Sequence, residues 1–411
     1  MFAPSVLALL ASVAAAGMIP QVHLGLTNVA LNCPAGVSVN FATATQDPVT
    51  VTYGVAGSAT TATANTTAFN YTVKTYTSPF LHSVNLCDLK PATEYKYTVG
   101  DFSASFVSPP AASADPTVIG LVGDADLDPD SFNEMIQPVQ NLTTQAIVIV
   151  GDYSYANGNH KIWDDWYNLQ QPVFSKLPNV GINGNHETIP CGDALRTYYS
   201  LNFGLVHLVF LDDYVGNTLT VGSDAWLAER QAQLDWFVAD LDKVDRSKTP
   251  YVTVFKHNPF YNMYTDHTCQ YADKIFEIPD KEACWRGNYT KATNEPQCGL
   301  QAKLEEAYAK YKVDVVFSGH VHGYERSEYI YQNKVNKEKG SIYVTTGAGG
   351  RGHAGARIAN VPSWNVYAEP AKFGASRIIA TREKMQVNWF MVENATQPAD
   401  YFEVRARRDA C

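Results

Sequence analysis

The sequence lacks an excess of positive charge. Its 31 Lys and Arg residues are outnumbered by 41 Asp and Glu residues, and the formal net charge is −10. A protein that binds nucleic acid non-specifically needs a basic face, so this balance argues against a nucleic-acid partner. It does not argue against a phosphate substrate, because bound metal ions would dominate the local field.

Long hydrophobic runs are scarce as well. The run at the N-terminus, Val6–Ala16, ends in the small-residue pattern of a cleavage site, and we predict that residues 1–16 are a signal peptide. The mature protein is then secreted, or delivered to a vacuolar or lysosomal lumen. A short membrane anchor is the alternative, but the run falls short of the ~20 residues of a spanning helix, so we predict no membrane partner.

The cysteines form no Cys-x-x-Cys pair, which argues against a cysteine-rich zinc site. Disulfides are the default in an oxidising compartment, and Cys33 and Cys87 are candidates for one in the N-terminal region. The odd count leaves one cysteine unpaired or paired between chains, with terminal Cys411 as the candidate. The seven cysteines are Cys33, Cys87, Cys191, Cys269, Cys284, Cys298 and Cys411.

Asn-x-Ser/Thr sequons are frequent for a chain of 411 residues. In a chain with a predicted signal peptide, this density indicates a secreted glycoprotein. The five sequons begin at Asn65, Asn70, Asn141, Asn288 and Asn394.

The length exceeds what one hydrophobic core usually supports, so we expect two domains. Over residues 18–112, short runs such as Val37–Phe41 and Tyr95–Val99 alternate apolar and polar side chains, the pattern of a small all-β sandwich. The segment Leu89–Tyr97 is similar to the turn into a late strand of a fibronectin type III domain. Pro109–Pro116 reads as a linker.

Residues 116–411 have a different pattern, in which apolar runs typical of buried strands alternate with helical periods. We predict helices over Asp224–Val244 and Leu300–Tyr311, whose apolar side chains recur at helical spacing. This alternation predicts an α/β domain. The predicted strands are Val118–Val122, Ala146–Val150, Val206–Leu211, Tyr251–Phe255, Val313–Phe317 and Ile342–Val344.

Five short clusters of polar side chains lie at or near the ends of these apolar runs, where an α/β sheet presents its ligands. Four of them begin with glycine, which lets the backbone turn sharply beside a cation. Together they offer the carboxylates, amide, imidazoles and phenol that a mixed two-metal site needs. The clusters are Gly123-Asp124, Gly151-Asp152-Tyr153-Ser154-Tyr155, Gly184-Asn185-His186-Glu187, Val254-Phe255-Lys256-His257 and Gly319-His320-Val321-His322.

In this order the five clusters resemble the signature of the purple acid phosphatases, and the resemblance extends from about residue 20 to the C-terminus. The longer strings Gly151–Ala156, His257–Asn262 and Gly319–Arg326 strengthen it. The resemblance implies a four-layer α-β-β-α metallophosphoesterase sandwich. An all-β fibronectin type III-like sandwich precedes it, as in the large form of the family.

The resemblance also implies a role for each matching residue. A ferric ion would be held on one side, a divalent iron, zinc or manganese ion on the other, and Asp152 would bridge the two. His186 and His267 would contact the substrate phosphate or protonate the leaving oxygen. The ferric ligands would be Asp124, Tyr155 and His322, and the divalent ligands Asn185, His257 and His320.

Two positions bear on how close the resemblance is. Tyr155 would give a ferric phenolate and a purple colour, and other two-metal phosphoesterases of this fold generally lack it. Asp126 is a departure, because the family usually has Gly-Asp-x-Gly in the first block, and it could bias the choice of metal or the approach of substrate.

The implied function is hydrolysis of small phosphate monoesters by a metal-bound hydroxide, with a histidine protonating the leaving alkoxide. A ferric ion keeps hydroxide available at low pH, so an acidic optimum is expected. The alternatives are a phosphodiesterase, a pyrophosphate- or phytate-cleaving enzyme, or a secreted binding protein without catalysis. The sequence leaves a homo-oligomer open.

Overall fold

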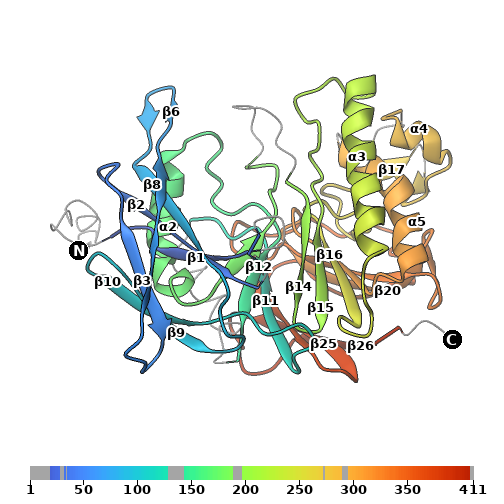
Figure 1. Cartoon of the computed structure of the whole chain (residues 1–411). Coiled ribbons are helices and arrows are strands. Elements are labelled where there is room, and N and C mark those ends of the chain that lie inside the picture. The colour runs from blue at the N-terminus through green and yellow to red at the C-terminus, as the bar shows by residue number, and fades with distance from the viewer. Residues whose placement is uncertain are drawn as a thin grey trace, which may run out of the picture.

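Two mixed β-sheets stacked face to face form the centre of the C-terminal region, residues 116–411 (Figure 1). The computed structural model describes residues 19–27, 32–33, 35–127, 143–187, 197–271, 274–288 and 295–407. The predicted signal peptide and the Asn141 sequon lie outside these residues. Within the described parts of the chain, no helix combines the length and the hydrophobicity needed to cross a membrane.

The N-terminal sandwich forms because its strands alternate apolar and polar side chains. In β2, the side chains of Val37, Val39 and Phe41 are buried in the sandwich core, while those between them are partly exposed. The predicted all-β pattern is therefore present. Its strands are β1 His23–Leu26, β2 Val37–Thr43, β3 Thr50–Val55, β4 Ala62–Asn65, β5 Thr67–Phe69, β6 Thr72–Val73, β7 Tyr76–Thr77, β8 Phe80–Leu86, β9 Glu94–Val99 and β10 Phe102–Val107.

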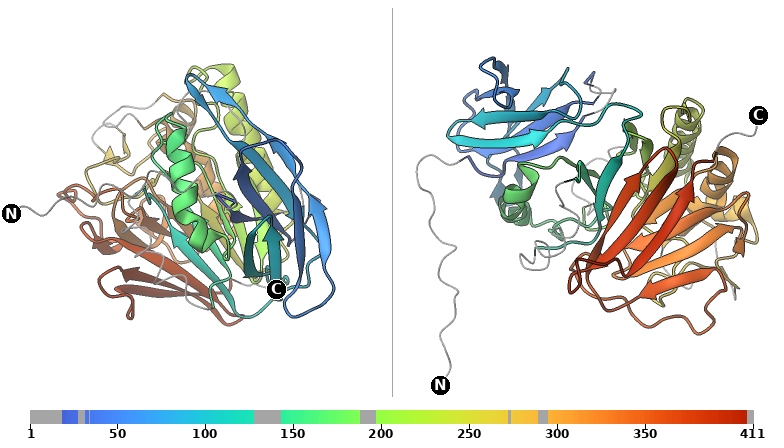
Figure 2. Two further views of the ribbon diagram at one scale, coloured as in Figure 1. Left: turned by 90° about the vertical axis from the view of Figure 1, so that its left-hand side faces the viewer. Right: turned by 90° about the horizontal axis from the view of Figure 1, so that it is seen from below.

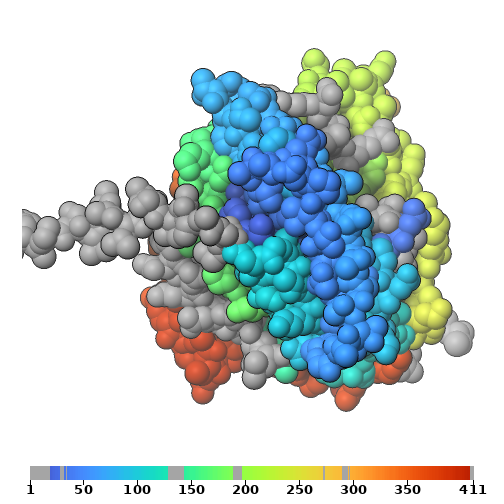
Figure 3. Space-filling view, turned by 60° about the vertical axis from the view of Figure 1, so that its left-hand side comes forward, coloured from blue at the N-terminus to red at the C-terminus, as the bar shows by residue number. Residues whose placement is uncertain are grey.

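One sheet of this sandwich continues into the C-terminal region. β1 pairs in parallel with β13 (Asn179–Gly181), so that ten strands form one sheet in the order β26-β25-β24-β11-β12-β13-β1-β2-β8-β5. Beside helix α2 (Lys161–Phe174), the Tyr97 hydroxyl donates to the carbonyl of Ser175 at 2.8 Å. Figure 3 shows the N-terminal strands packed directly against the green segment that contains α2. The sandwich is therefore joined to the C-terminal region by more than its linker.

The C-terminal region has four layers, with α2 outside the first sheet and α3 and α5 outside the second (Figures 1 and 2). The second sheet has the order β14-β15-β16-β19-β22-β20-β21, and β23 pairs with β20. The remaining elements are β11 Thr117–Val122, β12 Ala146–Ile149, β14 Tyr199–Phe203, β15 Val206–Phe210, α3 Asp224–Leu241, β16 Tyr251–Phe255, β17 Gln270–Tyr271, β18 Lys274–Ile275, α4 Lys281–Trp285, η2 Pro296–Leu300, α5 Gln301–Tyr311, β19 Val315–Ser318, β20 Tyr324–Tyr331, β21 Lys334–Val335, β22 Ser341–Thr346, β23 Asn365–Glu369, β24 Gly374–Ala380, β25 Lys384–Met391 and β26 Asp400–Arg405.

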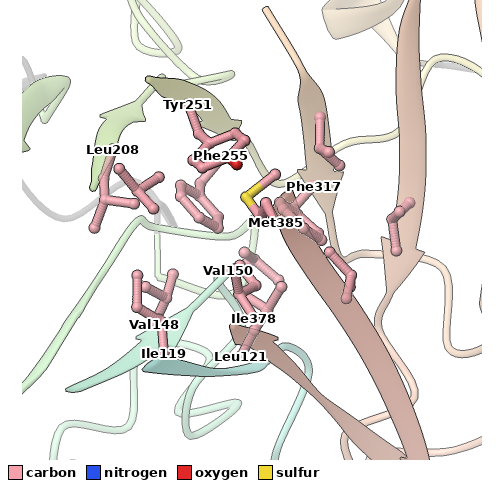
Figure 4. Close-up of a cluster of buried hydrophobic side chains, with 14 of the residues drawn as sticks. Ile119, Leu121, Val148, Val150, Leu208, Tyr251, Phe255, Phe317, Ile378 and Met385 are labelled. Carbon is pink, nitrogen blue, oxygen red and sulfur yellow. The ribbon is translucent and has the colours of Figure 1, made fainter. Parts of the chain in front are cut away.

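Burial of both sheet faces explains the continuous apolar runs of the central strands. In β12, Val148 faces the second sheet, where it joins the core of Phe255 and Phe317 (Figure 4). The next side chain along the same strand, Ile149, faces α2 and packs in a separate core with Trp166. The predicted four-layer α-β-β-α fold, preceded by an all-β sandwich, is confirmed.

Both predicted helices are present close to their predicted bounds, as α3 and α5. Helix α3 begins after Ser223, whose side chain accepts a hydrogen bond from the backbone N–H of Trp226 at 3.2 Å. Helix α2 is not among the predicted helices, although Trp163, Trp166 and Phe174 recur along it at helical spacing. Gln170 lies in the same buried stripe as Trp166 and Phe174, and Pro172 lies inside the helix.

The cysteines form two disulfides within the described residues. The predicted Cys33–Cys87 pair is present, and a second disulfide joins Cys269 to Cys298. Cys284 is free and buried, whereas the predicted odd cysteine, Cys411, lies outside the described residues.

Candidate metal centre

The five predicted clusters meet at one edge of the two stacked sheets, because each follows a strand of the parallel core. Contacts between the clusters join residues that are far apart in the sequence. The backbone N–H of His320 donates to Asp124 Oδ2 at 2.9 Å across 196 residues. The structure brings together all of the predicted ligands: Asp124 after β11, Asp152 and Tyr155 after β12, Asn185 after β13, His257 after β16, and His320 and His322 after β19.

Four of these residues have left-handed backbone conformations, which non-glycine residues rarely adopt. The φ angles are 57° at Asp124, 52° at Asp152, 50° at Tyr155 and 67° at His320. Such conformations persist only where the surrounding structure enforces them, and they cluster at functional sites. The backbone of the site therefore supports a functional role independently of its side chains.

Glycines that begin two of the clusters leave room for the carboxylates. A side chain at Gly184 would collide with the carboxylate of Asp152, and one at Gly319 would collide with that of Asp124. The glycines in these motifs are therefore required by the close approach of backbone and ligand.

The first group of donors contains Asp124, Tyr155 and His322. The Tyr155 hydroxyl lies 3.1 Å from Asp124 Oδ1 and 3.0 Å from His322 Nε2. His322 Nε2 lies 3.6 Å from the same carboxylate oxygen. One carboxylate, one phenol and one imidazole thus direct their donor atoms at a common point.

The second group contains Asn185, His257 and His320, with Asp152 beside them. His257 Nε2 lies 3.1 Å from Asn185 Oδ1 and 3.3 Å from Asp152 Oδ2. Ligand atoms of Asp152, His257 and His320 all lie within 4.8 Å of one another. His257 Nδ1 lies 2.7 Å from the carbonyl oxygen of Val150, so it carries the ring proton and leaves Nε2 free to bind a metal.

The charge of the site is what metal cations would balance. Asp124 and Asp152 are 0% and 1% exposed, and burial raises the pKa of Asp124 well above its usual range. Burial also raises the pKa of Tyr155, and the charge of Asp124 adds to this effect. Although burial opposes it, Asp152 raises the pKa of His257 to about 10. Without added positive charge, burial therefore favours the neutral forms of Asp124 and Tyr155, and two added cations would supply the charge that lets both bind as anions.

Glu187 holds the loops that carry Asp152 and Asn185, a role that the motif itself does not predict. Its carboxylate accepts hydrogen bonds from the backbone N–H groups of Asp152 at 2.8 Å, Tyr153 at 3.0 Å and Gly184 at 2.8 Å. Burial raises the pKa of Glu187 to about 7. The only sequence signal for this residue is its place directly after Gly184-Asn185-His186.

The two predicted catalytic histidines lie beside the donor groups and reach the surface. The backbone N–H of His186 donates to Asp152 Oδ1 at 3.1 Å, and the His267 ring lies 3.8 Å from that of His320. The His186 and His267 side chains are 29% and 30% exposed. His267 Nδ1 also lies 2.6 Å from Glu295 Oε1, a carboxylate that no motif predicts.

The departure at Asp126 leaves the loop conformation intact. Its φ angle is 61°, in the left-handed region that glycine adopts freely and aspartate tolerates. The carboxylate pairs with Arg351 at 2.7 Å, and the Arg351 guanidinium carbon lies 4.6 Å from the centre of the Tyr155 ring. Asp126 therefore adds an ion pair beside the first donor group.

A layered α-β-β-α fold with metal donors at the strand ends defines a metallophosphoesterase. The family model for calcineurin-like phosphoesterases matches residues 118–324. The model for the purple acid phosphatase N-terminal domain matches residues 19–112. The chain therefore belongs to the purple acid phosphatase family.

Named relatives and a solved structure agree with this assignment. The chain is 30% identical to purple acid phosphatase 23 of Arabidopsis thaliana, over 67% of this chain and 63% of that protein. It is 27% identical to Fe(3+)-Zn(2+) purple acid phosphatase 12 of the same plant, over 70% and 63%. A purple acid phosphatase from yellow lupin seeds matches in fold, with a TM-score of 0.73 at 18% identity, over 95% of this chain and 74% of that one. The matched region thus spans less than two thirds of either curated relative.

Proposed function

We propose that the protein is a secreted acid phosphatase that hydrolyses small phosphate monoesters with a ferric ion and a divalent ion. The observation that supports this proposal is the convergence of the seven predicted ligands into two donor groups with Asp152 beside them. Asp124, Tyr155 and His322 would hold the ferric ion. Asn185, His257 and His320 would hold the divalent ion, and Asp152 would bridge the two.

The two cations would act as Lewis acids on the phosphate and would lower the pKa of the attacking water. The histidines supply the remaining chemistry. Burial lowers the pKa of His186, which suits a neutral ring that hydrogen-bonds the phosphate. Burial also opposes protonation of His267, but Glu295 outweighs it and raises the pKa of His267. His267 therefore keeps the proton that the leaving alkoxide needs.

The metals are inferred from the donors and from one relative. The first donor group can contribute two anionic oxygens and the second none, which favours a trivalent ion in the first position. A relative whose name includes Fe(3+) and Zn(2+) supports iron with zinc. Divalent iron and manganese remain candidates for the second position.

Two observations support secretion. The four described sequon asparagines, Asn65, Asn70, Asn288 and Asn394, are all exposed and accessible to a glycosyltransferase. The two disulfides are typical of proteins that mature in an oxidising compartment. Sensitivity of the mass of the exported protein to an N-glycosidase would test this part of the proposal.

The activity is tested by elemental analysis together with a panel of esters at acidic and alkaline pH. We expect two metal ions per chain and the highest kcat/KM for monoesters at acidic pH. Faster cleavage of a diester, pyrophosphate or phytate would reassign the substrate class. A fully metallated protein that cleaves none of these compounds would instead be a binding protein.

A further inference from the structure

A carboxylate outside the predicted ligand set, that of Glu295, lies beside His320 of the second donor group and beside the predicted catalytic residue His267. Glu295 Oε1 lies 2.6 Å from His267 Nδ1 and 3.5 Å from His320 Nε2. Its second oxygen, Oε2, accepts a hydrogen bond from the side-chain amide of Asn258 at 3.2 Å. Its side chain is 18% exposed, so it is largely shielded from water.

The contact with Glu295 determines which nitrogen of His267 faces the substrate. An ionised carboxylate can only accept hydrogen bonds, so His267 Nδ1 must carry a proton and donate a hydrogen bond to Glu295. The other nitrogen, Nε2, lies 3.6 Å from the exposed Asp266 carboxylate, beyond hydrogen-bonding distance. Glu295 thus fixes the ring through Nδ1 and leaves Nε2 available to a substrate.

Glu295 is itself held by a buried network at the end of β16. The backbone N–H of Asn258 donates to Asp213 at 2.6 Å, and its side-chain oxygen accepts from the Tyr214 hydroxyl at 2.5 Å. Lys256 forms a buried ion pair with the same aspartate at 3.0 Å. These contacts hold Asn258 at the end of the sheet, and Asn258 gives Glu295 a hydrogen-bond partner outside its own loop.

The Cys269–Cys298 disulfide joins the two segments that meet in this contact. In the sequence, His267 lies just before Cys269 and Glu295 lies just before Cys298, and the two cysteines are 29 residues apart. The cross-link limits how far the two side chains can separate. Two independent restraints, the Asn258 network and the disulfide, therefore converge on one hydrogen bond.

We propose that Glu295 is a positioning residue that holds His267 in place to protonate the leaving group. The inference rests on the phosphatase function proposed above. As the P–O bond breaks, the proton on His267 Nε2 passes to the alkoxide oxygen. The ring becomes neutral and keeps its Nδ1 proton against Glu295, which stays ionised throughout. A proton from solvent then restores Nε2.

The test compares Glu295→Gln with Glu277→Gln, a control that removes an exposed carboxylate paired with Lys274 at the surface. The substrates are an alkyl phosphate, whose leaving group needs a proton, and 4-nitrophenyl phosphate, whose leaving group needs little help. We expect Glu295→Gln to lower kcat about 10-fold for the alkyl ester and less than about 2-fold for the nitrophenyl ester. Its metal content should equal that of wild type, and the control should match wild type throughout.

A double variant that combines Glu295→Gln with His267→Ala distinguishes a positioning role of Glu295 from a general loss of activity. If Glu295 acts through His267, the double variant should hydrolyse the alkyl ester as fast as His267→Ala alone. An equal loss for both esters, an unchanged kcat for both, or a lower metal content in Glu295→Gln would overturn the inference. A wild-type enzyme that cleaves no ester would defeat the phosphatase proposal and this inference together.

A second variant tests the contact between His267 and Glu295 without altering Glu295. Replacing both Cys269 and Cys298 with serine removes the cross-link while the Asn258 network remains. We expect a loss in the same direction, larger for the alkyl than for the nitrophenyl ester, in a protein whose circular dichroism is native. A native-like double serine variant with equal losses for both esters would show that the disulfide does not act through this contact.

Discussion

The two halves of the candidate metal centre differ in charge more than in geometry. In the half formed by Asp124, Tyr155 and His322, two of the three donors are oxygens that can be anionic. In the other half, Asn185, His257 and His320 contribute only neutral donors. Both groups bring their donor atoms within 3 to 4 Å of a neighbour. If the first half holds the ferric ion, as proposed, ligand charge and not the spacing of the donors would distinguish a trivalent from a divalent ion.

The surroundings of the two halves differ in the same way. Arg351 lies over the ring of Tyr155 and pairs with Asp126, so the anionic half has a cation at its edge. The neutral half is bordered instead by acceptors, the carbonyl of Val150 and the carboxylate of Glu295. The anionic half thus has a neighbouring cation, whereas the neutral half has neighbouring hydrogen-bond acceptors.

The largest expected effect comes from the residue that both halves would share. Asp152→Asn keeps the shape of the side chain but removes the buried charge between the halves. We expect kcat to fall by about 1,000-fold or more, the scale of losing a principal charge-stabilising group. Elemental analysis should find both metals depleted. A purified variant with two metals and near-normal kcat would show that Asp152 is not the bridge.

A matched pair of histidine substitutions tests whether the halves are independent. His322→Ala should deplete iron and leave most of the divalent ion, and His320→Ala should do the reverse. Each should lower kcat by at least about 100-fold, exceeding the loss usually seen when an outer partner of a ligand is removed. Parallel depletion of both metals in both variants would contradict two separable positions.

How far the sequence predicts this centre depends on whether a residue follows a strand. Parallel strands align their carboxyl ends, so Asp124 and His320 could be placed together although 196 residues separate them. Glu295 could not be placed, because it follows no apolar run and its position depends on Asn258 and the disulfide. Those are tertiary contacts, which leave no periodic pattern in the sequence.

The fold, like the site, has parts that the sequence pattern predicts and parts that it does not. Strands buried on both faces, such as β12, are apolar throughout and could be predicted from that run. The pairing of β1 with β13 could not, because one short parallel contact between two regions adds no pattern to either strand. Helix α2 does have an apolar face, formed by Trp163, Trp166 and Phe174, although Gln170 lies in the same stripe and Pro172 lies inside the helix. It could therefore have been predicted from its apolar pattern.

Tyr155→Phe tests the anionic half alone, and we expect a smaller loss of activity. The substitution removes one oxygen, so packing should be nearly unchanged. The visible charge-transfer band of the oxidised, iron-containing protein should disappear, while kcat falls only about 10-fold because Asp124, Asp152 and both outer histidines remain. Absorption spectroscopy with elemental analysis checks this. A band that survives the substitution would assign the phenolate to another tyrosine.

The smallest effect should come from Arg351, and it is spectroscopic. The guanidinium lies 4.6 Å from the centre of the Tyr155 ring, so its charge stabilises electrons on a phenolate there. Arg351→Ala should raise the energy of those electrons, reduce the gap to the ferric ion and move the band to longer wavelength. Because this side chain is 44% exposed, the interaction is worth only about 0.5–1 kcal/mol, and kcat should change less than about 5-fold.

Asp126→Gly, which places the residue usual for the family in the same left-handed position, separates the two members of this ion pair. If the guanidinium acts directly on the ring, Asp126→Gly should leave the band close to its wild-type position or shift it slightly to shorter wavelength, since Arg351 loses its countercharge. A shift to longer wavelength in both variants would mean that the ion pair, and not the charge of Arg351, holds the ring in place. The anionic half would then owe its stability to loop geometry, and the contrast in surrounding charge between the two halves would no longer account for it.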